Sequence, residues 1–487
     1  MRVYLETERL VLREFTGQDV DNVVELDSDP EVMRYLTGGA PTPGEKIRDE
    51  ILPRWLAFYD RADGLGYWAA VEKATGRFLG WFHFRQNRQP VRGDGSRREG
   101  VELGYRLRRD AWGKGYGTEG SRALIRKGFT ELGVTRVYAE TMTVNAASRR
   151  VMAKAGLRHV GTFVEDWPDH IPGDEQGAVE YALTRAEWAR AEYRAVEEEV
   201  FAGYQEGRYD EAVALIRSAL PHLPHWRSDL AHQCACLLAV AGRPTEALAE
   251  LRAAYDAGGW WHRRILADDD DLAGLRALDG FDELVALSHA RATAADPATR
   301  PPIVHRPDGP ARGVLVALHG AGQDADDAAE RWRTATEAGF VVAAPDSSQR
   351  NTPSYRSWPD PAIGGRDIAA ALDGLPDLPP VLAGFSAGGR QAVVSALAGH
   401  AAHFVVVAPA IGPEHLDDEH VTAAAARGVA GTVVVGARDL EVCDGALAAV
   451  ERLRRAGVTC HLDLVADLGH DFPADFPSMI KASQPRM

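Results

Sequence analysis

The sequence predicts a multidomain α/β protein with an α+β N-terminal part, a central α-helical repeat segment and a C-terminal doubly wound sheet. Three observations predict it. The chain has 487 residues, which is too long for one domain at roughly 150 residues per domain. Expected strands and helices alternate in both outer parts. The stretch between them is rich in alanine and leucine with helical spacing.

The first part spans residues 1–190. A helix with acidic residues in its first turn is expected to begin near Asp19. A polar, glycine-containing stretch over 85–100 predicts an exposed hairpin loop. Strands are expected at 9–13, 67–71, 78–84 and 101–107.

The central segment spans residues 195–290 and contains an internal repeat. Gly207 to Ala212 (GRYDEA) recurs as Gly242 to Ala247 (GRPTEA), an offset of 35 residues. This pattern resembles two tetratricopeptide repeats, whose period is about 34 residues, followed by a trailing helix around 281–287. Such repeats form helical scaffolds, so we expect either a protein partner on them or a rigid spacer.

The third part spans residues 303–487 and follows a linker over 291–302. Its strands are short and almost entirely apolar, which is typical of a parallel sheet covered by helices on both faces. They are expected at 313–318, 341–344, 381–383, 403–407 and 432–435.

Charge and cysteine content limit the environment and the partners. The formal net charge of −16 argues against a nucleic acid or an anionic membrane as the main partner. The first residues lack the features of a signal peptide, and no apolar run reaches the ~20 residues that span a bilayer. The four cysteines form no disulfide framework. These features favour a cytoplasmic protein with reduced thiols.

A glycine-rich turn follows the fourth N-terminal strand and leads into a helix expected over 119–132. Its glycines allow backbone amides to point inward, and the helix N-terminus adds partial positive charge. This combination predicts a cradle for a phosphate-bearing cofactor. The turn comprises Trp112, Gly113, Lys114, Gly115, Tyr116, Gly117 and Thr118.

Motifs on both sides of this turn occur in an order that resembles the GNAT acetyltransferases, most closely their ribosomal-protein and small-amine acetylating branch. The resemblance implies that acetyl-CoA is the acyl donor and that a small-molecule amine is the acceptor. The motifs are Glu8–Arg13, Glu102–Tyr105, Ala111–Glu119, Asn145–Ser148 and Lys154–Leu157.

The resemblance also implies roles for individual residues. The amides of residues 113–118 bind the pyrophosphate, Asn145 contacts the pantetheine arm and the Ser148 hydroxyl donates to the departing sulfur. The amine must lose a proton, and Glu102 is the candidate base, directly or through water. A carboxylate paired with an arginine is the alternative for Glu102, and a hydroxyl bonded to its own helical turn is the alternative for Ser148. A loop offers further acids and a histidine, namely Glu165, Asp166, Asp169 and His170.

A second catalytic signature lies in the third part. Gly384 to Gly388 (GFSAG) follows an apolar strand and predicts a nucleophile elbow that exposes Ser386. Asp439 and His470 follow in the order of the α/β-hydrolase triad. Glu441 is a rival for the acid.

The segment Leu318 to Gln323 (LHGAGQ) completes this signature. The amides of Ala321 and Ala387 are expected to form the oxyanion hole. Residues 305–480 resemble the phospholipase/carboxylesterase and dienelactone-hydrolase-like group. This resemblance implies hydrolysis of a small-molecule ester, thioester or amide.

No metal is expected from the sequence. His222, His225 and His232 lie near Cys234 and Cys236, but their spacing fits no zinc pattern. The run over 268–271 consists of four aspartates but lacks the glycine and distal glutamate of an EF-hand. We interpret the first group as helical core and the second as a solvated turn.

The sequence therefore predicts a bifunctional enzyme that combines acetyl transfer with serine-triad hydrolysis. Two alternatives stay open. In one, only the hydrolase is catalytic and the GNAT fold senses acyl-CoA. In the other, the chain is mainly a repeat-based scaffold.

Overall fold

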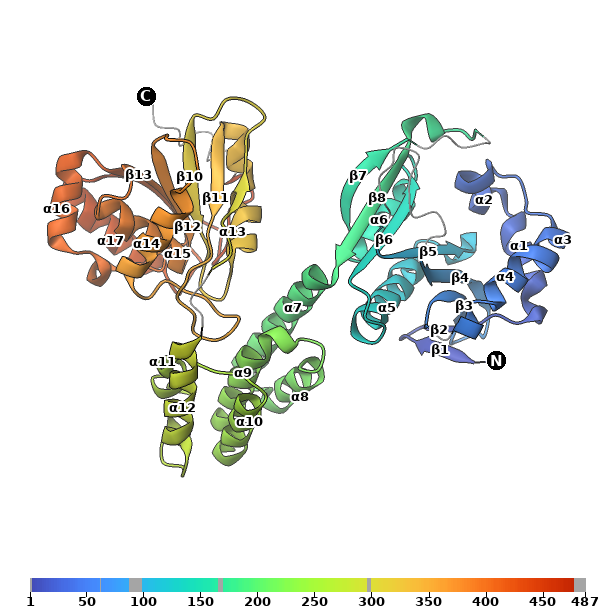
Figure 1. Cartoon of the computed structure of the whole chain (residues 1–487), viewed down its shortest axis with the longest axis horizontal. Helices are drawn as coiled ribbons and strands as arrows, with labels where there is room; N and C mark the ends of the chain where they lie inside the picture. The colour runs from blue at the N-terminus through green and yellow to red at the C-terminus, as the bar shows by residue number, and fades with distance from the viewer. Residues whose placement is uncertain (1, 62, 87–98, 165–169, 296–298, 477–487) are drawn as a thin grey trace. The chain divides into compact units, whose positions relative to one another are not determined.

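The computed structural model describes residues 2–61, 63–86, 99–164, 170–295 and 299–476. The chain divides into two compact units, residues 1–197 and 198–487, and each has its own architecture (Figure 1). The architecture is that of a multidomain α/β protein: an α+β N-terminal unit, a helical middle and a C-terminal sheet of the α/β-hydrolase kind. Most of the hairpin loop expected over 85–100 lies outside the described residues.

An eight-stranded sheet forms the centre of the first unit, in the order β1-β2-β3-β4-β5-β6-β8-β7. Neighbouring strands are antiparallel except for the parallel pair β5 and β6. The strands are β1 (Val3–Glu6), β2 (Leu10–Glu14), β3 (Gly66–Glu72), β4 (Phe78–Arg85), β5 (Val101–Leu107), β6 (Arg136–Met142), β7 (Arg158–Phe163) and β8 (Ala178–Thr184).

Both faces of this sheet are buried because side chains alternate along each strand. On β3, Trp68 and Ala70 join the core under α5 and α6, whereas Tyr67 and Ala69 join the core under α1, α2 and α4. The helices are α1 (Val20–Ser28), α2 (Pro30–Thr37), α3 (Gly44–Lys46), α4 (Leu52–Leu56), α5 (Tyr116–Thr130), α6 (Ala146–Lys154) and α7 (Arg185–Gln205).

Helices form the first part of the second unit. The helix α9 packs against both α8 and α10 (Figure 1). The helices are α8 (Tyr209–Ala219), α9 (Arg227–Val240), α10 (Pro244–Asp256), α11 (Arg263–Ala267) and α12 (Phe281–Ala294).

A seven-stranded sheet follows, in the order β15-β14-β13-β12-β10-β11-β9. All neighbouring strands are parallel except β9 and β11. The strands are β9 (Ile303–His305), β10 (Gly313–Leu318), β11 (Phe340–Ala344), β12 (Pro380–Phe385), β13 (His403–Val407), β14 (Ala430–Gly436) and β15 (Thr459–Val465). The helices are α13 (Ala325–Trp332), α14 (Pro361–Leu372), α15 (Ala387–Leu397), α16 (Asp418–Arg427) and α17 (Cys443–Arg455).

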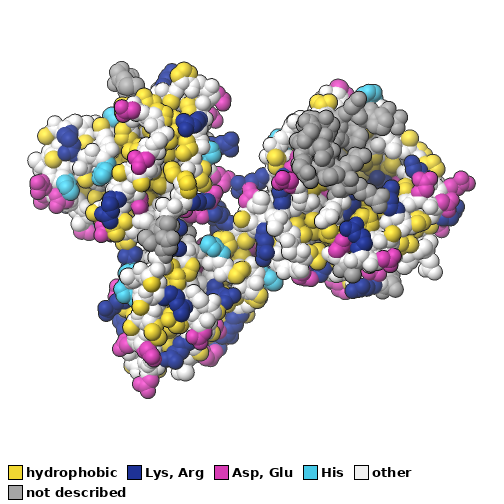
Figure 2. Space-filling model, in the orientation of Figure 1, with side chains coloured by type: hydrophobic (Ala, Val, Ile, Leu, Met, Phe, Trp, Pro, Cys, Tyr) yellow, Lys and Arg dark blue, Asp and Glu magenta, His cyan; other side chains and the backbone are white. Residues whose placement is uncertain are grey.

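The surface carries charges of both signs. On the face shown in Figure 2, basic and acidic side chains are interspersed over each unit. Every helix among the described residues is too short or too polar to cross a bilayer.

Candidate active sites

A wedge between β5 and β6 dominates the first unit. The two strands run parallel but pair only at Val101 with Val137 and at Glu102 with Tyr138. The rest of β5 and β6 therefore forms no pair between the two strands, which opens a gap in the middle of the sheet. The end of β5 leads to the glycine-rich turn, and the end of β6 leads to α6.

The glycine-rich turn lies at the β5 side of this gap. The helix α5 begins at Tyr116, not at Glu119 as the sequence suggested, so the second half of the turn is its first helical turn. Gly113 and Gly115 have φ values of +72° and +88°, a region that favours glycine. Among the described residues, none accepts a hydrogen bond from the N–H groups of residues 113–118. Six adjacent donors at a helix N-terminus suit a pyrophosphate.

Arg9, the residue before β2, holds the glycine-rich turn in place. Its guanidinium donates to the Lys114 carbonyl at 2.9 Å and pairs with Glu119 at 2.6 Å. Thr7 also donates to Glu119. Burial raises the pKa of Glu119, but the hydrogen bonds from Thr7 and Arg9 outweigh it and lower the pKa overall. Trp112 is partly exposed, and its indole donates to the Leu107 carbonyl at 2.8 Å.

Asn145 and Ser148 lie at the β6 side of the gap. Asn145 caps α6 by accepting from the Ser148 amide at 3.2 Å. The Ser148 hydroxyl lies 3.0 Å from the Tyr105 hydroxyl on β5, so this contact bridges the wedge. Burial raises the pKa of Tyr105 to about 12, which keeps the phenol protonated at neutral pH. The sequence prediction did not include Tyr105.

Glu102 lies at the closed end of the wedge among cationic and imidazole groups. One oxygen is 2.9 Å from Arg85 and the other is 3.4 Å from His83 Nε2. The arginine pairing that was the alternative for Glu102 is therefore present. The His83 imidazole lies where a Cβ on Gly104 would be, 2.4 Å from its Cε1, so only glycine fits there. Burial lowers the pKa of His83, which favours a neutral imidazole.

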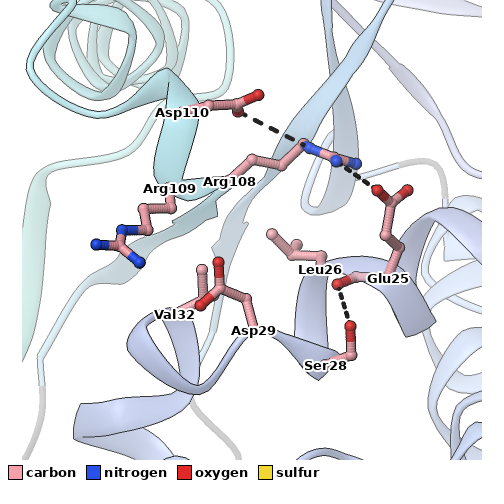
Figure 3. Close-up of a pocket in the computed structure, with 8 residues that line it drawn as sticks. All are labelled: Glu25, Leu26, Ser28, Asp29, Val32, Arg108, Arg109 and Asp110. Atoms are coloured by element: carbon pink, nitrogen blue, oxygen red, sulfur yellow. Dashed lines mark hydrogen bonds and ion pairs between the residues drawn. The ribbon is translucent and has the colours of Figure 1, made fainter.

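A pocket of about 670 Å³ opens between the α1–α2 corner and the segment that follows β5 (Figure 3). Arg108 pairs with Glu25 across it, and its Nε lies 3.9 Å from Asp110. The pocket thus carries three carboxylates against two guanidinium groups. Its lining comprises Glu25, Leu26, Ser28, Asp29, Val32, Arg108, Arg109 and Asp110.

Ser386 occupies a strained turn between β12 and α15 in the second unit. Its φ of +52° is rare for a side chain other than glycine. Two hydrogen bonds stabilise this strained conformation. Ser386 N–H donates to the Val407 carbonyl at 3.1 Å, and Ala410 N–H donates to the Ser386 carbonyl at 3.0 Å. A nucleophile elbow has this geometry.

The two outer glycines of the GFSAG segment are required by close backbone contacts. A Cβ on Gly384 would lie 2.3 Å from the Gly388 carbonyl oxygen, and a Cβ on Gly388 would lie 2.3 Å from the His319 carbonyl oxygen. The second contact brings the elbow against the end of β10. The segment expected to form the oxyanion hole therefore lies beside the serine.

Asp439 and His470 form a close pair. Asp439 is buried, and its Oδ2 lies 2.7 Å from His470 Nδ1. The His470 ring packs on Phe385, the neighbour of Ser386, with ring centroids 5.0 Å apart. Glu441 donates its backbone N–H to Asp439 Oδ1 at 3.3 Å.

The oxyanion segment is braced by buried polar contacts. His319 Nε2 accepts from the Ser347 amide at 3.1 Å, so Nδ1 carries the proton and donates to the Gly320 carbonyl at 2.7 Å. Trp358 donates to the His319 carbonyl. No described residue accepts a hydrogen bond from the Ala321 or Ala387 amide, which leaves both donors available.

Comparisons with known proteins decide the family. Residues 9–158 match the family model described as an acetyltransferase (GNAT) domain. The chain is 38% identical over 188 residues to the FsC-acetyl coenzyme A-N(2)-transacetylase of Aspergillus fumigatus, an alignment that covers 38% of this chain and 78% of that protein. This chain belongs to the GNAT acetyltransferases. Members of this family use acetyl-CoA as the acyl donor.

The second unit matches a different description. Residues 192–296 match the family model "A/B hydrolase-like, N-terminal domain", so the helical middle precedes an A/B hydrolase-like domain. Two solved structures are similar in part. An uncharacterized protein from Bacillus cereus is 22% identical with a TM-score of 0.34, covering 60% of this chain and 97% of that one. Acyl-protein thioesterase 2 of Zea mays is 18% identical with a TM-score of 0.32, covering 37% and 96%.

The GNAT unit brings the predicted turn, Asn145 and Ser148 to the two sides of one wedge, with Glu102 at its closed end. The strand alternation that puts Glu102 and Gly104 on one face is visible in the sequence. The neighbours of Glu102, His83 and Arg85, come from β4 and are reached only through strand register. Of the alternative loop acids, Glu165, Asp166 and Asp169 lie outside the described residues. His170 is exposed, with Nδ1 2.8 Å from Asp174.

Proposed function

We propose that this GNAT enzyme transfers an acetyl group to a small-molecule amine, and that its second unit hydrolyses an ester, thioester or amide through Ser386. The free amides of residues 113–118, at the unpaired ends of β5 and β6, support the first activity. The strained Ser386, together with the Asp439–His470 pair whose imidazole packs on the neighbouring Phe385, supports the second. The A. fumigatus relative is named an acetyl coenzyme A-N(2)-transacetylase, which supports acetyl transfer to nitrogen.

In the acetyl-transfer site, the six amides bind the pyrophosphate and the wedge accepts the thioester arm. Asn145 fixes the start of α6 beside that arm. The Ser148 hydroxyl donates to the sulfur as the carbon–sulfur bond breaks, and the protonated Tyr105 phenol supports it from β5. Glu102 is the sequence-derived base. Because His83 is neutral and faces Glu102, the imidazole is the immediate proton acceptor in our proposal, with the carboxylate behind it.

The acceptor amine enters through the pocket between the α1–α2 corner and Arg108 in this proposal. An amine arrives largely as an ammonium ion at neutral pH. The carboxylates of Glu25, Asp29 and Asp110 give the pocket a negative balance that attracts it. The hydrogen bond from Arg108 lowers the pKa of Glu25, so that carboxylate stays ionised.

Calorimetry with acetyl-CoA tests the first half of the proposal. The wild type should bind acetyl-CoA with micromolar affinity, and Gly115→Glu should lose binding because its side chain adds bulk and like charge to the cradle. Gly133→Glu is the control: Gly133 also has a positive φ but lies outside the turn. A Cβ on Gly133 meets nothing within 4 Å, whereas a Cβ on Gly115 lies 3.2 Å from the Arg9 guanidinium. Absence of binding by the folded wild type would refute this assignment.

In the hydrolase site, His470 takes the Ser386 proton as the hydroxyl attacks the carbonyl carbon, and Asp439 stabilises the resulting imidazolium. The amides of Ala321 and Ala387 stabilise the oxyanion. The leaving group departs with the His470 proton. Water then attacks the acyl-serine and regenerates the enzyme.

Hydrolysis of short-chain p-nitrophenyl esters tests the second half. Ser386→Ala should reduce kcat to background, and Asp439→Asn should reduce it by about 10⁴-fold. Glu441→Gln, two residues from Asp439, should stay within about twofold of the wild type. An active-site serine probe should label the wild type and not Ser386→Ala. Equal rates for the wild type and Ser386→Ala would contradict serine catalysis.

The helical middle supports the hydrolase site in our proposal. Asp229 of α9 accepts hydrogen bonds from Thr352 at 2.6 Å and from Ser354. These residues belong to the loop over 347–358 that contacts the oxyanion segment. Recruitment of a protein partner by tetratricopeptide-like repeats remains a prediction of the sequence.

A further inference from the structure

Two sequence motifs that were each interpreted as structural come together in the helical middle. His232 and Cys236 lie one turn apart on α9, and this spacing puts both side chains on one helix face. Asp269 follows the end of α11. The ligand atoms of the three side chains, His232 Nε2, Cys236 Sγ and Asp269 Oδ2, converge on one point.

The distances between these atoms suit a single metal ion. Nε2 lies 3.0 Å from Oδ2, and Sγ lies 3.7 Å from each of the other two atoms. A triangle with these sides has a centre about 2 Å from every corner, close to the Zn–N and Zn–O distances and slightly below Zn–S, so an ion just outside the plane satisfies all three. The Ile265 carbonyl oxygen also lies 3.2 Å from Nε2.

The surroundings leave one side of this cluster accessible. Cys236 is buried, whereas the His232 and Asp269 side chains are 20% and 27% exposed. An ion can therefore enter from solvent and keep water as its remaining ligand. A thiolate and a carboxylate together balance the charge of a divalent cation, and mixed sulfur, imidazole and carboxylate ligands favour zinc among the common metals.

We propose that His232, Cys236 and Asp269 form a zinc site that fastens α9 to the acidic turn after α11. On binding, the Cys236 thiol releases its proton to solvent and the sulfur forms the metal bond, with no change of oxidation state. The site shares no residue with either proposed active site.

The role that follows is structural. His262 N–H donates to the Asn351 carbonyl at 2.7 Å, and Arg264 donates to the Asn351 side chain at 2.9 Å. Both donors flank the start of α11. An ion that holds the end of α11 to α9 thereby stabilises the helical surface on which the loop over 347–358 rests.

Cobalt titration of the full-length protein tests the site. After treatment with a chelator, Co²⁺ should bind with a stoichiometry of one and produce thiolate-to-cobalt charge-transfer absorption that Zn²⁺ abolishes. Cys236→Ser should lose this absorption, and Asp269→Asn should bind Co²⁺ at least tenfold more weakly. Cys234→Ser, on the same helix but outside the cluster, and Cys443→Ser should keep both properties.

Thermal unfolding gives a second readout. Zn²⁺ should raise the unfolding midpoint of the wild type and of Cys234→Ser, but not that of Asp269→Asn, whose folded state is checked by circular dichroism. If the folded wild type gives no cobalt–thiolate absorption, or if Cys236→Ser gives the same absorption, the three side chains form a hydrogen-bonded cluster only and the proposal is wrong.

Discussion

His83 and Glu102 are the two candidates for the group that accepts the proton of the amine. Glu102 pairs with Arg85 at 2.9 Å, and this ion pair stabilises the carboxylate in its charged form. Neither ring nitrogen of His83 has a hydrogen-bond partner among the described residues, although Nε2 lies 3.4 Å from Glu102. Burial lowers the pKa of His83, and the Glu102 carboxylate opposes this by raising it. A neutral imidazole with a free nitrogen is the better acceptor.

The pH dependence of acetyl transfer distinguishes these two residues. If His83 is the acceptor, kcat/KM falls on the acidic side as His83 is protonated. Glu102→Gln removes the group that raises the pKa of His83, so this limb should move to lower pH while kcat stays within about tenfold. His83→Gln should reduce kcat by roughly 10² to 10⁴. The opposite ranking, with Glu102→Gln inactive and His83→Gln active, would make Glu102 the base.

Between elements, a buried carboxylate links the helical middle to the hydrolase-like sheet. Asp229 is 6% exposed, and hydroxyl groups of Thr352 and Ser354 donate to it. The same loop contacts the oxyanion segment through the hydrogen bond from Gly322 N–H to the Arg356 carbonyl. A helix of the middle segment therefore supports the peptide whose amide is expected to stabilise the oxyanion.

Asp229→Asn should weaken this support, because the amide group places a donor opposite a hydroxyl donor. A cost of about 1–3 kcal/mol is expected for an unsatisfied buried group, with a lower kcat for ester hydrolysis. Asp256→Asn, at an exposed position on α10, should change neither quantity. Differential scanning calorimetry and ester kinetics measure the two effects. An unchanged kcat in a destabilised Asp229→Asn would limit the link to stability.

The pH dependence of this effect has a defined sign. Burial raises the pKa of Asp229 above its ordinary value of 3.8, although the two hydroxyl donors oppose it. The folded protein therefore holds this proton more tightly than the unfolded chain, and the resulting stability is lost as the pH rises through the folded pKa. The wild type should lose stability relative to Asp229→Asn as the pH increases from below 3.8. A constant difference would show that the pKa of Asp229 is the same in the folded and unfolded states.

At the scale of the whole molecule, sequence motifs predicted the features that depend on local backbone geometry. They did not predict the side-chain contacts that form when strands pair and helices pack. Gly384 and Gly388 form part of a recognisable motif, and the structure shows why glycine is needed there: a Cβ at either position would meet backbone atoms. The approach of His83 to Glu102 depends on the register between β4 and β5. The approach of His232 to Asp269 depends on packing between segments more than 30 residues apart in the sequence. Neither can be inferred from one sequence by periodicity.

The two activities should be separable because the two sites lie in different compact units with separate hydrophobic cores. Gly115→Glu should therefore hydrolyse p-nitrophenyl esters within about twofold of the wild type, and Ser386→Ala should bind acetyl-CoA unchanged. If the GNAT unit instead only senses acyl-CoA, its ligand must bind differently to two states of the protein, and a coupling of 1–3 kcal/mol would change ester hydrolysis about 5- to 150-fold.

Ester hydrolysis measured with and without saturating acetyl-CoA decides between these cases. We expect no change in kcat/KM of ester hydrolysis for the wild type, because in our proposal acetyl-CoA is a substrate of the GNAT site and not a regulator of the hydrolase site. A change of fivefold or more in the wild type that disappears in Gly115→Glu would support the sensor. Acetyl transfer to an amine by Ser386→Ala, at the rate of the wild type, would then show whether the GNAT unit is catalytic as well.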